Sequence, residues 1–307
     1  MERRQLGNSD LRVSAVGLGG NTFGRTCDAA RTAAIVHRAL QLGVNFIDTA
    51  DAYSDGRSEE LLGAALRGHR DEVVLCTKTG WPRPGADAGG MLHPKRIAAS
   101  LEASLRRLGT DHIDVYYFHR PDPSTPIEES LVAAGELVRA GKVRYVACSN
   151  YPAWQVAEMT AKAGARGFDG PVASQVGFNL IDRSAEAEMI PACEHFGLSI
   201  IPYSPLASGF LTGKYRPGSS LPQGTRLQQN EPARERLLTG ANFEKLGRYE
   251  AFAAERGRSV GELAIAWLLA HRVVGSVISG ATSTEQVEAN VAASDWTISA
   301  EDLAALQ

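Results

Sequence analysis

The sequence predicts a (β/α)8 barrel, and two repeating patterns lead to that prediction. Short apolar runs recur roughly every thirty residues, and they begin near Val16, Phe46, Val73, Val115, Tyr145, Ser174, Ser199 and Ser276. Apolar runs bounded by turn residues are typical of parallel strands that are buried on both faces. The segments between them carry apolar residues at helical spacing. Strands that alternate with helices in this way indicate an α/β protein, either a TIM barrel or an open doubly wound sheet.

The glycines after the first expected strand distinguish these two architectures. An open sheet that binds a dinucleotide carries the pattern G-x-G-x-x-G at this point. Here the chain reads Gly17, Leu18, Gly19, Gly20, Asn21, Thr22, which lacks the third glycine. We therefore expect the closed barrel, formed by residues 1–307 as a single domain.

Glycines also mark where the helices should end, because a glycine easily takes the left-handed conformation that follows a last turn. Three helices are predicted with their stop residues: 32–42 with Gly43, 94–108 with Gly109, and 127–140 with Gly141. Gly164, Gly197 and Gly257 should likewise follow helical stretches.

Two further segments depart from the strand–helix repeat. Residues 3–14 resemble a β-hairpin with its turn at 8–10, which could close the bottom of the barrel. The long interval before the last strand holds a loop rich in glycine and proline at 208–232, followed by helices at 242–256 and 260–270.

Composition excludes several classes of protein. Lysine and arginine number 32 against 35 acidic residues, a net charge of −3, so we expect neither nucleic acid nor membrane as a partner. The chain has no apolar run of about 18 residues and no signal peptide at its start. Its four cysteines show no C-x-x-C pair, and no residue cluster has metal-ligand spacing. These features predict a reduced, cytoplasmic protein without a metal site. Cys76 and Cys148 should be packing residues, whereas Cys27, in a loop, should react first with thiol reagents.

Ionisable residues end three of the expected strands, where the chemistry of such barrels collects. Asp48, Lys78 and His119 each follow an apolar run, and Tyr53 lies five residues past Asp48. Each residue alone has a structural explanation, as a helix cap, a solvated lysine, a core histidine or a packing tyrosine. Together they form a proton-donating site, because an ammonium group near a phenol lowers its pKa from the ordinary ~10. A carboxylate would hold the ammonium, and a histidine would orient a carbonyl or relay the proton.

Seven separated motifs resemble the aldo-keto reductase superfamily. They lie at 43–63, 76–81, 114–131, 141–151, 174–179, 201–215 and 280–290. The run "SPLASGFLTGKY" is similar to the bacterial branch related to potassium-channel beta subunits. The resemblance implies an NADPH-dependent carbonyl reductase on a (β/α)8 barrel, with Tyr53 as general acid. Lys78, paired with Asp48, would lower the pKa of Tyr53, His119 would place the carbonyl, and Trp81 would wall the substrate pocket.

The resemblance also implies a set of residues that bind the cofactor NADP(H). Ser149, Asn150 and Gln175 would hold the nicotinamide carboxamide, and Tyr203 would stack on the ring. The pyrophosphate and other phosphates would be bound by Ser204, Pro205, Leu206, Ala207, Ser208, Gly209, Lys214 and Arg226. The adenosine end would be bound by Gly280, Thr282, Ser283, Gln286 and Asn290. The full set includes Gly20, Asn21 and Asp48.

Three positions depart from the pattern of the family. Many relatives have lysine or arginine where this chain has Thr282 and Ser283, and a glutamate where it has Ala289. Cations at the first two positions would bind the 2′-phosphate that distinguishes NADP from NAD, but the branch related to channel subunits has small polar residues there instead. The resemblance therefore implies that NADP(H) is preferred and that use of NAD(H) is possible. The expected partner is a small-molecule carbonyl substrate of unknown identity, in a pocket shaped by loops 21–28, 81–91 and 120–126. The sequence leaves the oligomeric state open.

Two alternatives to the reductase function are a cofactor-sensing subunit with little turnover and an aldolase that forms a Schiff base on Lys78.

Overall fold

The computed structural model describes residues 1–82 and 90–306. Eight parallel strands form one sheet in the order β10-β3-β4-β5-β6-β7-β8-β9. The strands are β3 (Val16–Gly19), β4 (Phe46–Asp48), β5 (Val74–Thr79), β6 (Ile113–Phe118), β7 (Val143–Ser149), β8 (Pro171–Gly177), β9 (Ser199–Tyr203) and β10 (Val277–Gly280). The ring closes where Ile200 of β9 forms a parallel bridge with Val274, which lies shortly before β10, and Gly275 N–H donates to the Ile200 carbonyl over 3.0 Å. The predicted barrel is thus confirmed.

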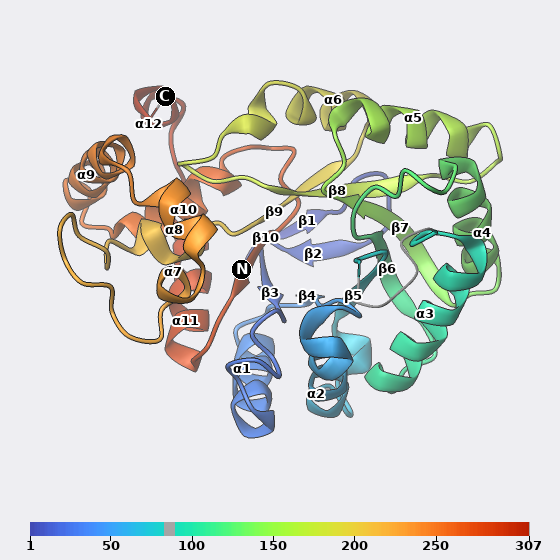
Figure 1. Ribbon diagram of the computed structural model, residues 1–307. Helices are drawn as coiled ribbons and strands as arrows, with labels where there is room; N and C mark the ends of the chain where they lie inside the picture. Colours follow the sequence, from blue (N-terminus) through green and yellow to red (C-terminus); the bar gives the residue numbers. More distant parts are fainter. Residues whose placement is uncertain (83–89, 307) are drawn as a thin grey trace.

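Helices surround the strands, as Figure 1 shows. Those that follow the strand–helix repeat are α1 (Ala29–Gln41), α2 (Arg57–Ala65), α3 (Pro94–Leu108), α4 (Ile127–Arg139), α5 (Ala153–Gly164), α6 (Met189–Phe196) and α11 (Thr284–Ala292). The additional helices are α7 (Arg226–Gln229), α8 (Glu231–Leu237), α9 (Gly240–Ala254), α10 (Val260–Leu269) and α12 (Ala300–Ala305). In the described part of the chain, no helix is long and apolar enough to cross a membrane.

In most of the strands, neighbouring apolar residues belong to two separate layers. In β6, Tyr116 and Phe118 belong to the layer shared with the surrounding helices, whereas Val115 and Tyr117 belong to a smaller layer shared with the N-terminal hairpin. This follows from the period of two in a strand, which points neighbouring side chains to opposite faces. Both faces of the sheet are therefore apolar, which explains the continuous apolar runs in the sequence.

The N-terminal hairpin pairs β1 (Arg3–Gln5) with β2 (Arg12–Ser14), antiparallel, and lies across the ring of strands in Figure 1. Leu6, Leu11 and Val13 are buried in the inner apolar layer. The guanidinium of Arg4 donates hydrogen bonds to the carbonyls of Val274 (3.0 Å) and Leu269 (2.9 Å), which ties the hairpin to the segment between α10 and β10. The predicted hairpin cap is confirmed.

Some predicted boundaries are wrong, each for a local reason. Helix α1 begins at Ala29, earlier than predicted, because the Asp28 side chain accepts from Arg31 N–H and caps it. Gly164 is the last residue of α5 rather than its stop, and the left-handed glycine comes at Gly167. The loop predicted at 208–232 contains α7 and the start of α8.

The expectation that Cys27 is the accessible thiol is also wrong. Cys27 is buried, and its Sγ lies 3.9 Å from the carbonyl oxygen of Ala281. Cys76, Cys148 and Cys193 are buried as well, and all four cysteines are free. Burial raises the pKa of the Cys148 and Cys193 thiols to about 12, so they remain protonated and unreactive at neutral pH.

Candidate active site

Neighbouring strands bring the predicted ionisable residues to one edge of the barrel. Asp48 is the last residue of β4, Lys78 lies one residue before the end of β5, and His119 directly follows β6. Because β4, β5 and β6 pair in parallel, their carboxyl ends lie side by side. Tyr53 opens the short 3-10 turn Tyr53–Gly56 that follows β4. The structure thus places all four residues together, as the sequence predicted.

The ammonium group of Lys78 lies at the centre of this cluster. Lys78 is completely buried, and its Nζ lies 2.5 Å from Oδ2 of Asp48, 2.7 Å from the carbonyl oxygen of Thr49 and 3.4 Å from Oη of Tyr53. An ammonium has three protons to donate, and these three oxygens account for them. The phenol of Tyr53 therefore lies at the end of a chain that begins at a buried carboxylate.

The turn that carries Tyr53 has an unusual backbone. Ser54 and Asp55 have φ of 49° and 53°, in the left-handed region that non-glycine residues rarely take. Such residues cost of order ~1 kcal/mol each and persist where the surroundings fix them. Here the hydroxyl of Ser54 donates to the Phe23 carbonyl over 3.0 Å. The turn is therefore held in the conformation that directs Tyr53 toward Lys78.

Burial and charge act in opposite directions on the two proton-exchanging groups. Burial raises the pKa of Tyr53, and the nearby Lys78 lowers it, with a net shift upward. The expected effect of Lys78 is present, but it does not bring the pKa of the phenol below its ordinary value. Burial lowers the pKa of Lys78, but Asp48 and Tyr53 raise it by more, so that the lysine stays charged. Tyr53 is therefore a protonated donor beside a permanent cation.

His119 is a neutral ring. Burial, together with the charges of Lys78 and Arg120, lowers its pKa to about 2. Its Nδ1 is buried and has no hydrogen-bond partner among the described residues. The ring packs against Trp81 at 4.7 Å and against Tyr53 at 5.8 Å between centroids. At neutral pH, His119 can thus orient a polar group but does not carry a charge.

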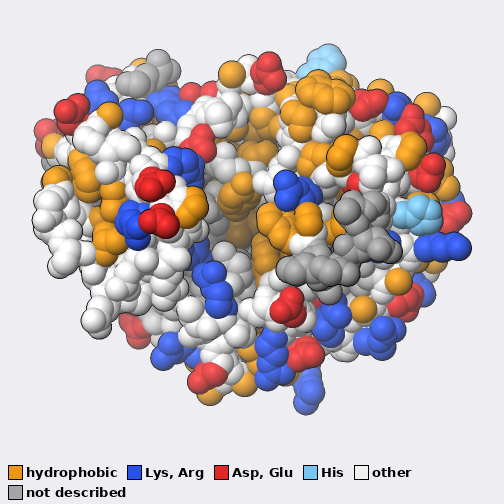
Figure 2. All heavy atoms as spheres, in the orientation of Figure 1, with side chains coloured by type: hydrophobic (Ala, Val, Ile, Leu, Met, Phe, Trp, Pro, Cys, Tyr) orange, Lys and Arg blue, Asp and Glu red, His pale blue; other side chains and the backbone are white. Residues whose placement is uncertain are grey.

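A cavity of about 960 Å³ opens above this cluster. Figure 2 shows the hollow at the centre of this face, with hydrophobic side chains inside it and basic ones at its rim. Asp48, Tyr53, His119 and Trp81 line it, whereas Lys78 lies beneath its wall. Of the residues predicted to bind the cofactor, Ser283, Gly20 and Ala207 do not line it. The others do: Asn21, Asp48, Ser149, Asn150, Gln175, Tyr203, Ser204, Pro205, Leu206, Ser208, Gly209, Lys214, Arg226, Gly280, Thr282, Gln286 and Asn290.

Hydrogen bonds connect the residues at the inner end of the cavity. Gln175 Nε2 donates to Asp48 Oδ1 over 3.0 Å. The hydroxyl of Tyr203 donates to Asn150 Oδ1 over 2.8 Å, and Asn150 Nδ2 donates to the carbonyl of His119 over 2.9 Å. The side chains at the ends of β7, β8 and β9 are thereby fixed relative to the Asp48–Lys78 pair.

The outer end of the cavity has the features of an anion site. Ser204, Ala207, Ser208 and Gly209 all have φ between 45° and 86°, a backbone curvature that can turn N–H groups toward an anion. Lys214 and Arg226 line the same region, and neither forms an ion pair with any carboxylate in residues 1–82 and 90–306.

Two glycines, which have no side chain, make room for Lys214 and for the Asn21 side chain that Arg226 contacts. A Cβ on Gly209 would lie 2.8 Å from Nζ of Lys214, and one on Gly280 would lie 3.0 Å from Oδ1 of Asn21. Arg226 donates to that same Asn21 oxygen over 2.9 Å. The exposed Lys214 and the partly buried Arg226 have no acidic partners among the described residues and suit phosphate groups, so the residues present fit a phosphate-bearing cofactor such as NADP(H).

Part of the cavity wall was not predicted. Ser259, Gly261, Glu262 and Ile265, at the start of α10, line the cavity. The sequence signal at this place is S-x-x-E, which marks a helix start. The structure contains that capping box, with Glu262 N–H donating to Ser259 Oγ over 3.2 Å and Ser259 N–H donating to the Glu262 carboxylate over 2.9 Å. Nothing in that pattern indicates a binding site.

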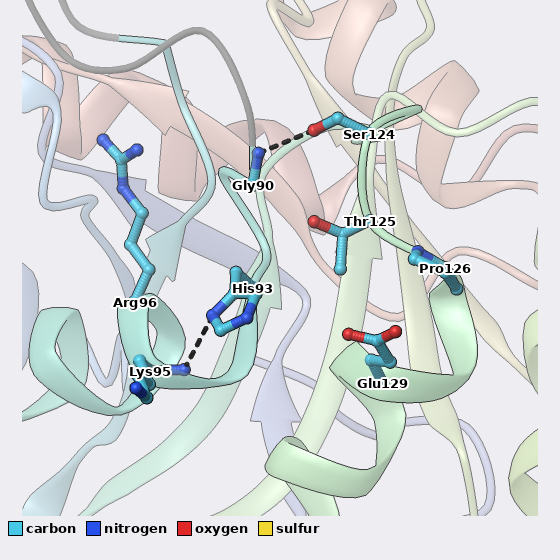
Figure 3. A pocket seen from close by; sticks show the side chains of 8 residues that line it. All are labelled: Gly90, His93, Lys95, Arg96, Ser124, Thr125, Pro126 and Glu129. Carbon is cyan, nitrogen blue, oxygen red and sulfur yellow. Dashed lines mark hydrogen bonds between the residues drawn. The ribbon is translucent and has the colours of Figure 1, made fainter.

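Figure 3 shows a second, shallower cavity of about 570 Å³ outside the barrel mouth. It lies between the start of α3 and the segment before α4, and Gly90 N–H donates to Ser124 Oγ over 2.6 Å at its edge. His93, Lys95 and Glu129 are among its lining residues. It contains none of the four clustered residues. Of the loop predicted at 81–91, residues 83–89 lie outside the described residues.

The comparison with known proteins agrees with this geometry. A sequence model of the Aldo/keto reductase family matches residues 15–307. The chain belongs to the aldo/keto reductase family. The site at the carboxyl ends of its strands is where enzymes built on this barrel carry out their chemistry.

Three relatives illustrate the range of this aldo/keto reductase family. The chain is 37% identical to a probable voltage-gated potassium channel subunit beta of Oryza sativa subsp. japonica, over 96% of this chain and 92% of the relative. It is 34% identical to L-glyceraldehyde 3-phosphate reductase of Escherichia coli (strain K12), over 99% and 91%. It is 36% identical to aflatoxin B1 aldehyde reductase member 2 of Homo sapiens, over 92% and 82%. The family and these reductases identify an oxidoreductase of carbonyl compounds.

Proposed function

We propose that this protein catalyses the reversible, NADPH-dependent reduction of aldehydes or ketones to alcohols, with Tyr53 as the general acid. The observation that supports this most directly is the position of the Lys78 ammonium, which joins the Asp48 carboxylate to the Tyr53 phenol under the wall of the large cavity. A phenol beside a buried cation can release a proton because the cation stabilises the phenolate that remains.

The chemistry that NADPH would supply is the hydride that reduces the carbonyl carbon. Tyr53 would give its proton to the carbonyl oxygen, so that the products would be the alcohol, NADP⁺ and a Tyr53 phenolate beside the charged Lys78. The phenolate would then regain a proton from solvent. His119 would donate a hydrogen bond to the carbonyl oxygen as a neutral ring, since its pKa is lowered to about 2. Trp81, 41% exposed at the mouth, would cover the apolar part of the substrate.

The lining of the cavity supports the assignment of the cofactor residues. Ser149, Asn150 and Gln175 would hold the nicotinamide carboxamide, and Tyr203 would stack on the ring. The backbone at 204–209, together with Lys214 and Arg226, would bind the phosphates. Gly280, Thr282, Gln286 and Asn290 would contact the adenosine end. We propose that NADPH is preferred over NADH through Lys214 and Arg226, since Thr282 and Ser283 offer only hydroxyl groups.

One observation favours a second function. A relative with 37% identity carries the name of a probable potassium channel subunit beta. The chain could therefore be a cofactor-binding subunit with little turnover. The cluster of Asp48, Lys78, Tyr53 and His119 favours the reductase, because a binding subunit has no need of a proton donor. We also propose that residues 1–307 form a single domain and that the protein works in the cytoplasm, which its four free cysteines support.

The test is steady-state consumption of NADPH, followed by absorbance, with a panel of aldehydes and ketones and with NADH in parallel. The reductase predicts turnover with several aldehydes and a higher kcat/KM with NADPH. Stoichiometric binding of NADPH without turnover of any carbonyl would favour the binding subunit.

A further inference from the structure

Arg120 lies beside the part of the site where a substrate would enter. It directly follows His119 at the end of β6, and the carbon of its guanidinium lies 5.1 Å from the centre of the Trp81 ring. The other neighbour of that ring is His119, at 4.7 Å between ring centres. One tryptophan ring therefore contacts both the group expected to place the carbonyl and a cation at the surface.

Among the described residues, this cation has no acidic partner. Arg120 is exposed, and within residues 1–82 and 90–306 no carboxylate lies within 4.0 Å of its guanidinium nitrogens and no hydrogen bond from it is present. Its charge still reaches the site, because it contributes, after burial and Lys78, to the low pKa of His119. The remaining cations of the site have other tasks: Lys78 is bonded to Asp48, and Lys214 and Arg226 lie at the outer end of the cavity.

The segment after Arg120 is held in place by hydrogen bonds. The Asp122 carboxylate accepts from Leu92 N–H over 2.8 Å and from the hydroxyls of Ser124 (2.6 Å) and Thr125 (2.8 Å). Ser124 in turn accepts from Gly90 N–H, the bond drawn at the top of Figure 3. Asp122 is thereby committed to this segment and is not available to neutralise Arg120. An anchored backbone also reduces the entropy that the arginine loses when it binds a ligand.

We propose that Arg120 binds an anionic group on the carbonyl substrate, so that the preferred substrates are aldehydes that carry a carboxylate or a phosphate a few bonds from the carbonyl. A guanidinium donates two parallel hydrogen bonds to either group, and the Trp81 ring between Arg120 and His119 would cover the carbon chain that joins the two ends of the substrate. The proposal rests on the proposed reductase function and names the substrate class of the same site.

The experiment compares two aldehydes of equal shape and different charge, 4-carboxybenzaldehyde and 4-nitrobenzaldehyde, at saturating NADPH. The enzymes are the wild type, Arg120→Met, Arg120→Lys and the control Arg96→Met, which removes a cation from the neighbouring cavity of Figure 3. Loss of one charged hydrogen-bonding partner weakens the binding of a ligand ~10–100-fold. We expect Arg120→Met to raise KM for the carboxylate ~10–100-fold with little change in kcat, and to leave the nitro compound within ~3-fold. Arg120→Lys should retain part of the preference, and Arg96→Met all of it.

Equal changes in KM for the two aldehydes would overturn the proposal, since Arg120 would then only pack on Trp81. A binding measurement separates this result from failure of the reductase function. Calorimetric titration with 4-carboxybenzyl alcohol and with benzyl alcohol, in the presence of NADP⁺, requires no turnover. If no aldehyde is reduced but Arg120→Met still weakens binding of the carboxylate alone, the anion site stands and the reductase function fails. Equal binding of both alcohols to the wild type would overturn the anion site.

Discussion

Gln175 donates a hydrogen bond from Nε2 to Oδ1 of Asp48, over 3.0 Å, while Lys78 Nζ lies 2.5 Å from the other oxygen of the same carboxylate. Both oxygens of Asp48 therefore have partners. The amide that we expect to face the nicotinamide also holds the carboxylate that anchors Lys78. The proposed cofactor site and the proposed proton-donating site thus share one side chain, and a change at either should be felt at the other.

The first prediction concerns the buried ion pair. Lys78→Met leaves the Asp48 carboxylate buried without its cation, and we expect a loss of ~3–5 kcal/mol in the free energy of unfolding. Replacing both partners, in Asp48→Asn/Lys78→Met, should restore much of that stability, since no buried charge remains. Neither variant should regain turnover. Urea unfolding and kcat at saturating NADPH measure the two effects, and a double variant as unstable as Lys78→Met would contradict this account.

The second prediction concerns the proton donor. Tyr53→Phe keeps the ring but removes the proton, and general acid catalysis contributes ~10²–10⁴-fold. We expect kcat to fall at least ~10²-fold while the affinity for NADPH, measured by fluorescence quenching, stays within ~3-fold. Tyr151→Phe is a matched control, because that hydroxyl is also buried but lies outside the lining of the large cavity. Near wild-type kcat in Tyr53→Phe would show that another group is the acid.

The third prediction concerns the choice of cofactor. Arg226 donates to Asn21 and has no acidic partner in the described chain, so its charge is free for a phosphate. Arg226→Ala should weaken NADPH binding ~10–100-fold and affect NADH much less. Lys95→Ala, an exposed cation outside the large cavity, should change neither. Titration with both cofactors decides the matter, and equal losses for NADPH and NADH would remove Arg226 from the 2′-phosphate.

The fourth prediction concerns acid stability. The pKa of His119 falls from 6.5 to about 2 on folding, so between these values the unfolded chain binds a proton that the folded chain does not. The contribution of this group is therefore fully present above pH 6.5 and is lost as the pH falls. The loss between pH 7 and pH 5 lowers the free energy of unfolding by about 2 kcal/mol.

The measurement is the free energy of unfolding in urea at pH 7, 6 and 5. We expect His119→Gln to lose less stability over this range than the wild type. His93→Gln, in which an exposed ring is changed, should keep the wild-type slope. Identical slopes in wild type and His119→Gln would show that the ring is not held neutral.

The fifth prediction concerns the thiols. Because Cys27, Cys76, Cys148 and Cys193 are all buried, the native protein should resist an aromatic disulfide reagent. All four should react together in denaturant. Fast modification of Cys27 alone in the native state would mean that the 22–27 segment opens.

The sequence predicted most of the barrel because strands buried on both faces leave unbroken apolar runs, as in β5 and β6. It predicted that Asp48, Tyr53, Lys78 and His119 would lie together, because polar residues that end such runs are conspicuous. The sequence did not indicate that the start of α10 lines the cavity, because Ser259 and Glu262 are already explained as a capping box. The burial of Cys27 was not predicted either, since it depends on a bridge between Phe23 and Cys27 that folds the loop inward.

The upward shift of the Tyr53 pKa was not predicted, for a different reason. The pattern of charges near it can be inferred from strand ends, and the effect of Lys78 has the expected sign. Desolvation, the larger effect, depends on how completely neighbouring segments cover the phenol. That coverage is a property of the packed molecule and is absent from any local pattern of residues.

The hairpin at the N-terminus has a consequence for the order in which the chain folds. Arg4 finds its acceptors at Leu269 and Val274, which lie 265 and 270 residues away along the chain. Leu6, Leu11 and Val13 share their apolar layer with strand residues as distant as Ile201 and Ile278. Contacts so distant along the chain form slowly, because the loop that joins them is long. Packing of the hairpin against the strands should therefore be a late step in folding, which completes the inner apolar layer.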